Sequence, residues 1–194
     1  MKILNISIIR NDSKPATTLA AASELSSYGF FQRSSVQEFI NFFAATICER
    51  TPAGQRQSVE QQGMFGHVHS RPEGIALMMV TDAEYPSRVA FTLLTKVGDD
   101  FIAQVPKTQW RKDIGFSSLQ NYLTQYQDPQ KADPMMRVQK ELDETKIVMH
   151  KTIESVLERG EKLDNLVNRS EQLSAQSKMF YKSAKNTNSC CGVM

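Results

Sequence analysis

The C-terminal tail carries the residues with the clearest chemistry, Cys190-Cys191-Gly192-Val193-Met194. Its last four residues fit a C-a-a-X box, in which the thiol of Cys191 is prenylated and a terminal methionine favours farnesyl. One lipid chain gives only marginal membrane binding, so stable attachment needs a second signal. Cys190 is the natural candidate for it, as a palmitoyl or second prenyl site. The sequence therefore predicts a chain that is attached to a membrane by lipid.

Other side chains that could do chemistry form no catalytic set. His67 and His69 are expected to share one face of a strand, but no cysteine or carboxylate cluster with metal-ligand spacing accompanies them. A G-x-x-x-x-G-K-[ST] phosphate loop is absent, and Cys48 is interpreted as a small packed hydrophobe on a helix. We therefore expect neither an enzyme nor a resident metal or cofactor.

Composition narrows the class of protein further. The chain has 194 residues, of which 40% are hydrophobic, and a formal net charge of +2. This balance argues against a nucleic-acid binder that is held by phosphate contacts. Three cysteines, two of them in the tail, do not suit a disulfide framework and favour a reducing compartment. No stretch approaches the roughly 18 consecutive apolar residues that a spanning helix needs.

Residues 1–127 predict an α+β domain, beginning with its strands. Apolar and polar residues alternate over residues 4–8, which is the pattern of a strand with one buried face. Residues 63–69 and 75–80 predict two more strands. The turn-forming residues 70–74 between them indicate a hairpin. We expect a small antiparallel sheet.

Helices are predicted to flank that sheet. Ser35 and Glu38 fit a capping box, and the apolar positions after Ser35 recur at helical spacing. A second helix is expected from Pro86, whose fixed φ suits a first turn. A third is expected from Ser117, with Gln120 as its capping partner. An antiparallel sheet covered by helices is an α+β architecture.

A different periodicity follows the Pro-containing linker 128–134. Residues 135–187 predict one long helix, and residues 188–194 form the lipidated tail. Alternating steps of three and four along the helix define a seam, which is a coiled-coil signature. The seam residues are Met135, Val138, Leu142, Thr145, Met149, Thr152, Val156, Arg159, Leu163, Leu166, Ser170, Leu173, Ser177, Phe180, Ala184 and Thr187.

Arg159 is the one charged residue on this seam. Burial of a guanidinium costs roughly several kcal/mol of stability unless its N–H donors are hydrogen-bonded. Copies of this helix meeting one another would bring several arginines into one layer. The seam therefore predicts different partner helices with hydrogen-bond acceptors opposite Arg159. A single polar layer of this kind also fixes the register of a bundle.

These residues resemble a known family. The segment Val156-Leu157-Glu158-Arg159-Gly160-Glu161-Lys162-Leu163 resembles the centre of R-SNARE motifs. The segment Glu84-Tyr85-Pro86-Ser87-Arg88-Val89-Ala90-Phe91 resembles part of a longin domain, which is profilin-like. With the two tail cysteines, the chain resembles the lipid-anchored, YKT-type longin R-SNAREs, relatives of synaptobrevin.

The resemblance implies a role in intracellular membrane fusion. Arg159 would form the ionic zero layer against three Q-SNARE helices, and the other seam residues would form the remaining layers of a four-helix bundle. The longin domain would inhibit and target the protein. The resemblance also implies a cytoplasmic pool and peripheral attachment to Golgi, vesicle, endosomal or vacuolar membranes.

We also predict a closed state from the residues themselves. Further apolar residues widen the helix surface beyond the seam, namely Ile147, Val148, Ile153, Leu157 and Val167. More apolar surface is present than a four-helix bundle requires, so the region is expected to fold back on the longin domain. Phe42 is the candidate docking residue, because it lies on the flank of its helix's apolar stripe. The alternative that Phe42 belongs to the domain's own core remains open.

Other functions fit less well. A longin-type adaptor or tether would use the coiled coil as a scaffold, but it would not need a central arginine. An acyltransferase activity leaves no identifiable motif. A leucine-zipper DNA binder needs a dense basic stretch, whereas residues 128–143 are mixed in charge.

Overall fold

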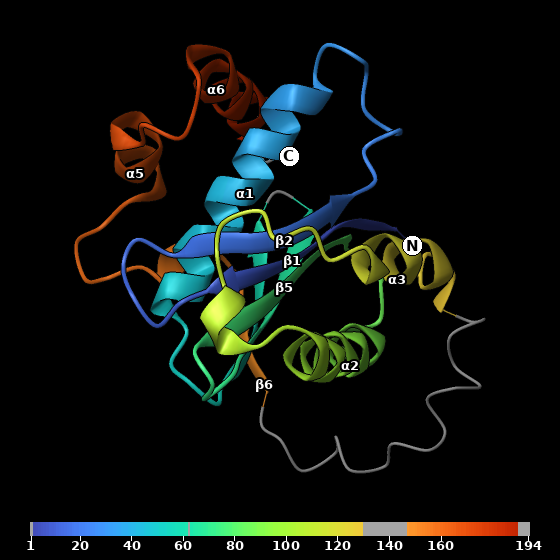
Figure 1. Ribbon diagram of the computed structural model, residues 1–194. Coiled ribbons are helices and arrows are strands. Elements are labelled where there is room, and N and C mark those ends of the chain that lie inside the picture. The colour runs from blue at the N-terminus through green and yellow to red at the C-terminus, as the bar shows by residue number, and fades with distance from the viewer. Residues whose placement is uncertain (1, 62, 130–146, 190–194) are drawn as a thin grey trace.

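A mixed sheet lies at the centre of the protein (Figure 1). The computed structural model describes residues 2–61, 63–129 and 147–189, and these form six strands in the order β2-β1-β5-β4-β3-β6. All neighbouring strands are antiparallel except β3 and β6, which run parallel. The strands are β1 (Ile3–Arg10), β2 (Thr17–Ser23), β3 (Arg56–Gln61), β4 (Met64–Ser70), β5 (Ile75–Asp82) and β6 (Ile147–His150).

Three of these strands match the sequence prediction. β4 and β5 form the expected hairpin, whose turn contains Gly74 at a φ of +97°. β1 is buried on both faces, not only on the face that its alternation predicts. Asn5 on its second face donates its amide N–H to Ser23 Oγ at 2.9 Å, while its buried Oδ1 has no hydrogen-bond partner among the described residues. The sequence does not predict β3, which has one aliphatic residue, Val59, and is stabilised by a neighbouring strand on each side.

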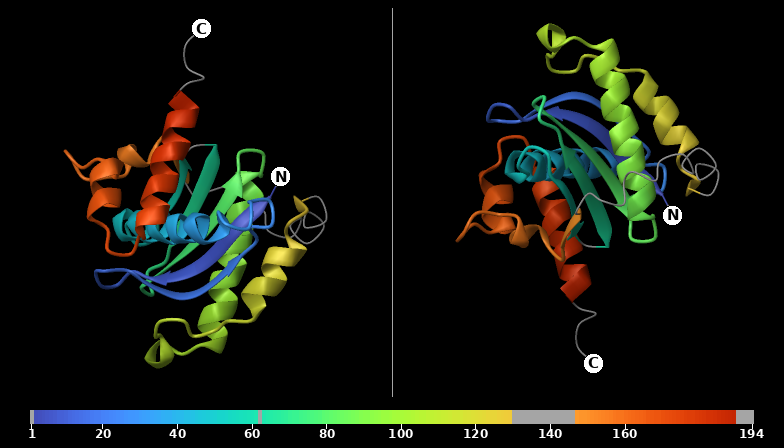
Figure 2. Two further views of the ribbon diagram at one scale, coloured as in Figure 1. Left: turned by 90° about the horizontal axis from the view of Figure 1, so that it is seen from above. Right: turned by 90° about the horizontal axis from the view of Figure 1, so that it is seen from below.

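Three helices cover the two faces of the sheet. α1 packs on one face, and α2 and α3 pack on the opposite face (Figure 2). Gly66 in β4 allows the close approach of α1, because a Cβ at that position would lie 2.7 Å from Phe43 Cε1. A large cluster of buried apolar residues lies between the sheet and the helices on each face. The helices are α1 (Arg33–Arg50), α2 (Ser87–Gln104) and α3 (Ser118–Gln125), with a 3-10 turn at Lys107–Gln109.

The predicted capping boxes are not formed. α1 begins at Arg33, and no side chain caps its N-terminus. Ser35 lies buried within the first turn, so it is not positioned to cap it, and Glu38 bonds to a distant part of the chain. α3 begins after Ser117 as predicted, but the contact there is a backbone bond from Gln120 N to Ser117 O at 3.3 Å. In α1 the motif fails because the helix begins two residues before Ser35, which places Ser35 after the N-cap position.

The prediction of one continuous helix is wrong for residues 147–189 in this conformation. This stretch, the fold-back segment, forms β6, a 3-10 turn η3 (Ile153–Ser155), α5 (Leu163–Arg169) and α6 (Ala175–Ser189). Its apolar residues occupy more than one helical face, so the chain bends to bury them against α1. Gly160, at a φ of +92°, provides one bend. Several predicted features lie outside the described residues, namely seam positions Met135, Val138, Leu142 and Thr145, linker residues 130–134, and Cys190 and Cys191.

Candidate interaction surface on helix α1

Helix α1 is buried on two sides. One apolar side packs on the sheet, as the predicted stripe requires, and a second side is covered by the fold-back segment. A helix that is apolar around much of its circumference needs cover on more than one side. The buried residues that the fold-back segment adds to this cluster are Ile153, Leu163, Val167, Leu173 and Tyr181. The α1 surface and the fold-back segment together form the candidate site.

An aromatic group lies at the centre of this contact. The ring of Tyr181 stacks on the ring of Phe39, with centroids 5.4 Å apart, and Phe39 in turn stacks on Phe43 at 6.3 Å. The Tyr181 hydroxyl donates to Asp164 Oδ1 at 2.8 Å, which joins α6 to α5. Burial raises the pKa of the Tyr181 phenol, so it stays a neutral donor. Tyr181 is not a seam residue, and the sequence analysis did not single it out.

Phe42 lies where α1 meets the fold-back segment. Its side chain is 8% exposed and belongs to the apolar cluster that includes Leu163 and Leu173. Its ring centroid is 6.5 Å from that of Phe39. It also lines a hollow of about 400 Å³ together with Leu166 of α5. This position is compatible with a docking role and with a core role, because the same cluster also contains core residues of the sheet.

Glu38 supplies a polar contact beside the aromatic group. Its Oε2 accepts the backbone N–H of Ser174 at 2.8 Å and the hydroxyl of Ser177 at 2.7 Å. These bonds satisfy donors at the N-terminal end of α6, where an anion is favoured. They also hold the pKa of Glu38 below its usual range, with the Ser174 N–H as the largest cause. Glu38 therefore caps a helix that lies far away in the sequence, which explains why it does not cap its own.

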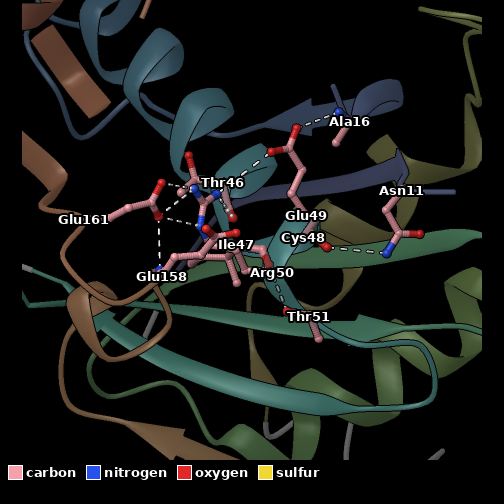
Figure 3. Close-up of polar contacts among 10 residues, drawn as sticks. All are labelled: Asn11, Ala16, Thr46, Ile47, Cys48, Glu49, Arg50, Thr51, Glu158 and Glu161. Carbon is pink, nitrogen blue, oxygen red and sulfur yellow. Dashed lines mark hydrogen bonds and ion pairs between the residues drawn. The ribbon is translucent and has the colours of Figure 1, made fainter. Parts of the chain in front are cut away.

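Arg50 provides a second polar contact at the opposite end of α1 (Figure 3). Its Nη2 donates to Glu161 Oε2 at 3.0 Å and Oε1 at 3.2 Å, and its Nε lies 3.3 Å from Oε2. The Glu161 carboxylate also accepts the backbone N–H of Glu158 at 3.0 Å. That N–H is the largest cause of the lowered pKa of Glu161, and Arg50 adds to it. The sequence carries no signal for this pair, whose members are separated by 111 positions.

β6 completes the surface by covering the edge of the sheet. It pairs in parallel with β3 from Arg56↔Ile147 to Val59↔His150. An uncovered edge strand presents unpaired backbone groups, so β6 satisfies groups that would otherwise face solvent. This contact depends on the backbone and is therefore not visible in side-chain periodicity.

The predicted seam is not presented as one stripe in this conformation. Arg159 lies exposed in a turn beside Gly160, and Met149 is 57% exposed. Thr187 lies in α6. The other described seam residues are exposed at Thr152, half-buried at Val156, Leu166, Ser170, Phe180 and Ala184, and buried at Leu163, Leu173 and Ser177.

The candidate catalytic residues are not assembled into a site. His67 is fully buried and bonded to Ser58 Oγ through Nδ1 at 2.8 Å, and burial lowers its pKa to about 4. Cys48 is buried, which raises the pKa of its thiol and leaves it protonated. Among residues 2–61, 63–129 and 147–189, no group of three potential metal ligands comes together. Within the same part of the chain, no helix is long and apolar enough to cross a bilayer.

Comparison with known proteins identifies the family. A model for the longin, or regulated-SNARE-like, domain matches residues 25–123, and a synaptobrevin model matches residues 134–191. The chain belongs to the longin-type synaptobrevin family. A synaptobrevin homolog ykt6 from Schizosaccharomyces pombe is 56% identical and covers 98% of both chains. Synaptobrevin homologs YKT6 from Eremothecium gossypii and Saccharomyces cerevisiae are 56% and 52% identical over the whole of both chains.

Membership in the longin-type synaptobrevin family settles the class of function. The protein is an R-SNARE of vesicle fusion, and neither of its two domains is catalytic. The α+β fold class is confirmed, and SNARE proteins of this family act on intracellular membranes. The family match spans both the domain that provides α1 and the segment that folds back on it.

Proposed function

We propose that this R-SNARE alternates between a closed state and a bundle with three Q-SNARE helices. In the bundle, Arg159 is the central ionic layer, and the remaining seam residues form the other layers. The supporting observation is that several seam residues are buried in the conformation described above. Leu163, Leu173 and Ser177 are seam residues, and all three are buried on the α1 side of the sheet. A side chain buried against α1 is unavailable to a partner helix, so the two states exclude one another.

The closed state buries apolar residues that lie off the seam and would have no partner in the bundle. Ile153 and Val167 lie off the seam and are 1% and 0% exposed. Burial of these aliphatic side chains favours the closed state, and the loss of backbone entropy on ordering the segment opposes it. Because these terms oppose one another, Q-SNARE helices with a longer continuous interface can displace α1.

Lipid attachment at Cys191, as farnesyl, and at Cys190, as palmitoyl or a second prenyl, complements this switch. Both cysteines follow α6 within a few residues, so tension from bundle formation along α6 would reach the bilayer directly. An anchor of this kind leaves the protein able to return to the cytosol when it closes. The compartments that we propose are Golgi, vesicle, endosomal and vacuolar membranes.

The first test replaces Phe42 with glutamate. A carboxylate in this apolar cluster is unfavourable, so Phe42→Glu should open the protein, move it from the cytosolic to the membrane fraction, and speed assembly with Q-SNARE helices. Circular dichroism and thermal unfolding show whether the longin domain remains folded. A folded variant that fractionates like the wild type would exclude the docking role of Phe42.

The second test addresses the central layer. Mixing the full chain with three Q-SNARE helices should give a heat-resistant four-chain complex, and Arg159→Ala or Arg159→Leu should weaken it. Arg159 is exposed in the closed state, so these changes should not open the protein. If no set of Q-SNARE helices forms a complex, the adaptor or tether function is favoured.

A further inference from the structure

We propose that Arg50, the last residue of α1, prevents formation of the central layer in the closed state. It does so by holding the turn that contains Arg159 in a non-helical form. This inference rests on the proposed closed state and names the contact that regulates it. Arg50 belongs to the longin domain and has no place in the four-helix bundle. Its role is therefore confined to the closed state, where it acts on Glu161, two residues beyond Arg159.

The central turn, residues Glu158–Glu161, cannot exist within a helix. Gly160 has a φ of +92°, whereas an α-helix needs a φ near −63°. The N–H of Glu161 bonds to the carbonyl oxygen of Glu158 at 2.9 Å, and the N–H of Glu158 bonds to the side chain of Glu161 at 3.0 Å. A helix would send the Glu158 N–H to the carbonyl four residues earlier. The turn must therefore open before the helix can pass through Arg159.

Arg50 holds the carboxylate on which this turn depends. Its contacts with both oxygens of Glu161 form a charge-assisted fork. The Arg50 side chain is 14% exposed and that of Glu161 is 29% exposed, so water screens the pair less than a surface ion pair. Arg50 is itself oriented by a bond from Nη1 to Thr46 O at 3.1 Å and by Glu49 at 3.9 Å (Figure 3). The fork is thus part of a fixed network at the end of α1.

The pair lies at the boundary between more exposed and more buried seam residues. On the N-terminal side, Met149 in β6 is 57% exposed, Thr152 is exposed and Val156 is half-buried. On the C-terminal side, Leu163 is 2% exposed. Because β6 is an edge strand, its release from β3 would free the layers before the turn while Leu163 stays covered. Release of Glu161 from Arg50 then controls the passage of zippering from the first half of the motif to the second.

The test is a double-mutant cycle in the full chain, using Arg50→Gln, Glu161→Gln and the double variant. Hydrogen exchange over residues 158–185 reports opening without partners. Loss of a charge-assisted pair should speed this exchange about tenfold to a hundredfold in either single variant. The double variant should be no faster than the singles, because each change removes the same pair. Additive effects of the two changes, or no effect of Arg50→Gln, would overturn the inference.

Assembly kinetics separate this inference from the closed state itself. With Q-SNARE helices labelled at either end, Arg50→Gln should speed association of the layers after Arg159 and leave that of the earlier layers unchanged. Arg10→Gln is the matched control, because Arg10 pairs with Asp12 within the longin domain. If Phe42→Glu accelerates assembly but Arg50→Gln does not, only the role of Arg50 fails. If neither variant does, the closed state fails.

Discussion

Replacement of Tyr181 by alanine is expected to open the fold-back segment without altering the fusion machinery. Tyr181 is 4% exposed, stacks on Phe39, and lies off the seam. Loss of the ring contact removes about 0.5–1.5 kcal/mol, and loss of buried apolar area removes about 1.5–3 kcal/mol. Asp164 is not left unpaired by the change, because Lys185 Nζ lies 2.6 Å away. The sum, about 2–4.5 kcal/mol, shifts the closed–open equilibrium by about thirtyfold to two-thousandfold.

Hydrogen exchange followed by mass spectrometry measures this shift directly. Peptides from α5 and α6 should lose protection in Tyr181→Ala, while peptides from β1 and β5 keep it, because the N–H groups of these two central strands are held by strand pairing within the sheet. The control is Met179→Ala, which removes a side chain that is 67% exposed on the same helix and should change nothing. Unchanged protection of α6 in Tyr181→Ala, or an equal loss in Met179→Ala, would refute the argument that this aromatic contact holds the closed state.

Two further predictions follow from ionisable groups. Glu38→Gln should speed exchange of the Ser174 amide severalfold, since a neutral amide is a weaker acceptor for the α6 N-terminus, and an unchanged rate would exclude the cap. Wild-type stability should fall between about pH 6.5 and 4, because the unfolded chain binds a proton that buried His67 resists. Urea unfolding at both ends of this range should show a smaller pH dependence for His67→Gln, and equal slopes would assign the effect to other groups.

Prediction from the sequence succeeded where neighbouring residues decide the outcome. The β4–β5 hairpin follows from two apolar runs around a turn, and the apolar stripe of α1 matches its sheet-facing side. It failed where the partner is distant. Nothing near Glu38 indicates that it caps α6, and nothing near Arg50 indicates Glu161. Contacts of this kind depend on which elements meet, so no local pattern contains them.

The fold-back segment separates most clearly what the sequence determines from what only the tertiary structure decides. The sequence alone determines the seam centred on Arg159, the family to which the chain belongs, and an excess of apolar residues beyond the seam. It therefore encodes two interfaces in one stretch. Only the tertiary structure decides that residues 147–150 are a strand and that Arg159 lies in an exposed turn. The physical reason is that most of the stability of a helix comes from the surface on which it packs. With α1 as that surface, the segment bends to bury Ile153, Val167 and Tyr181.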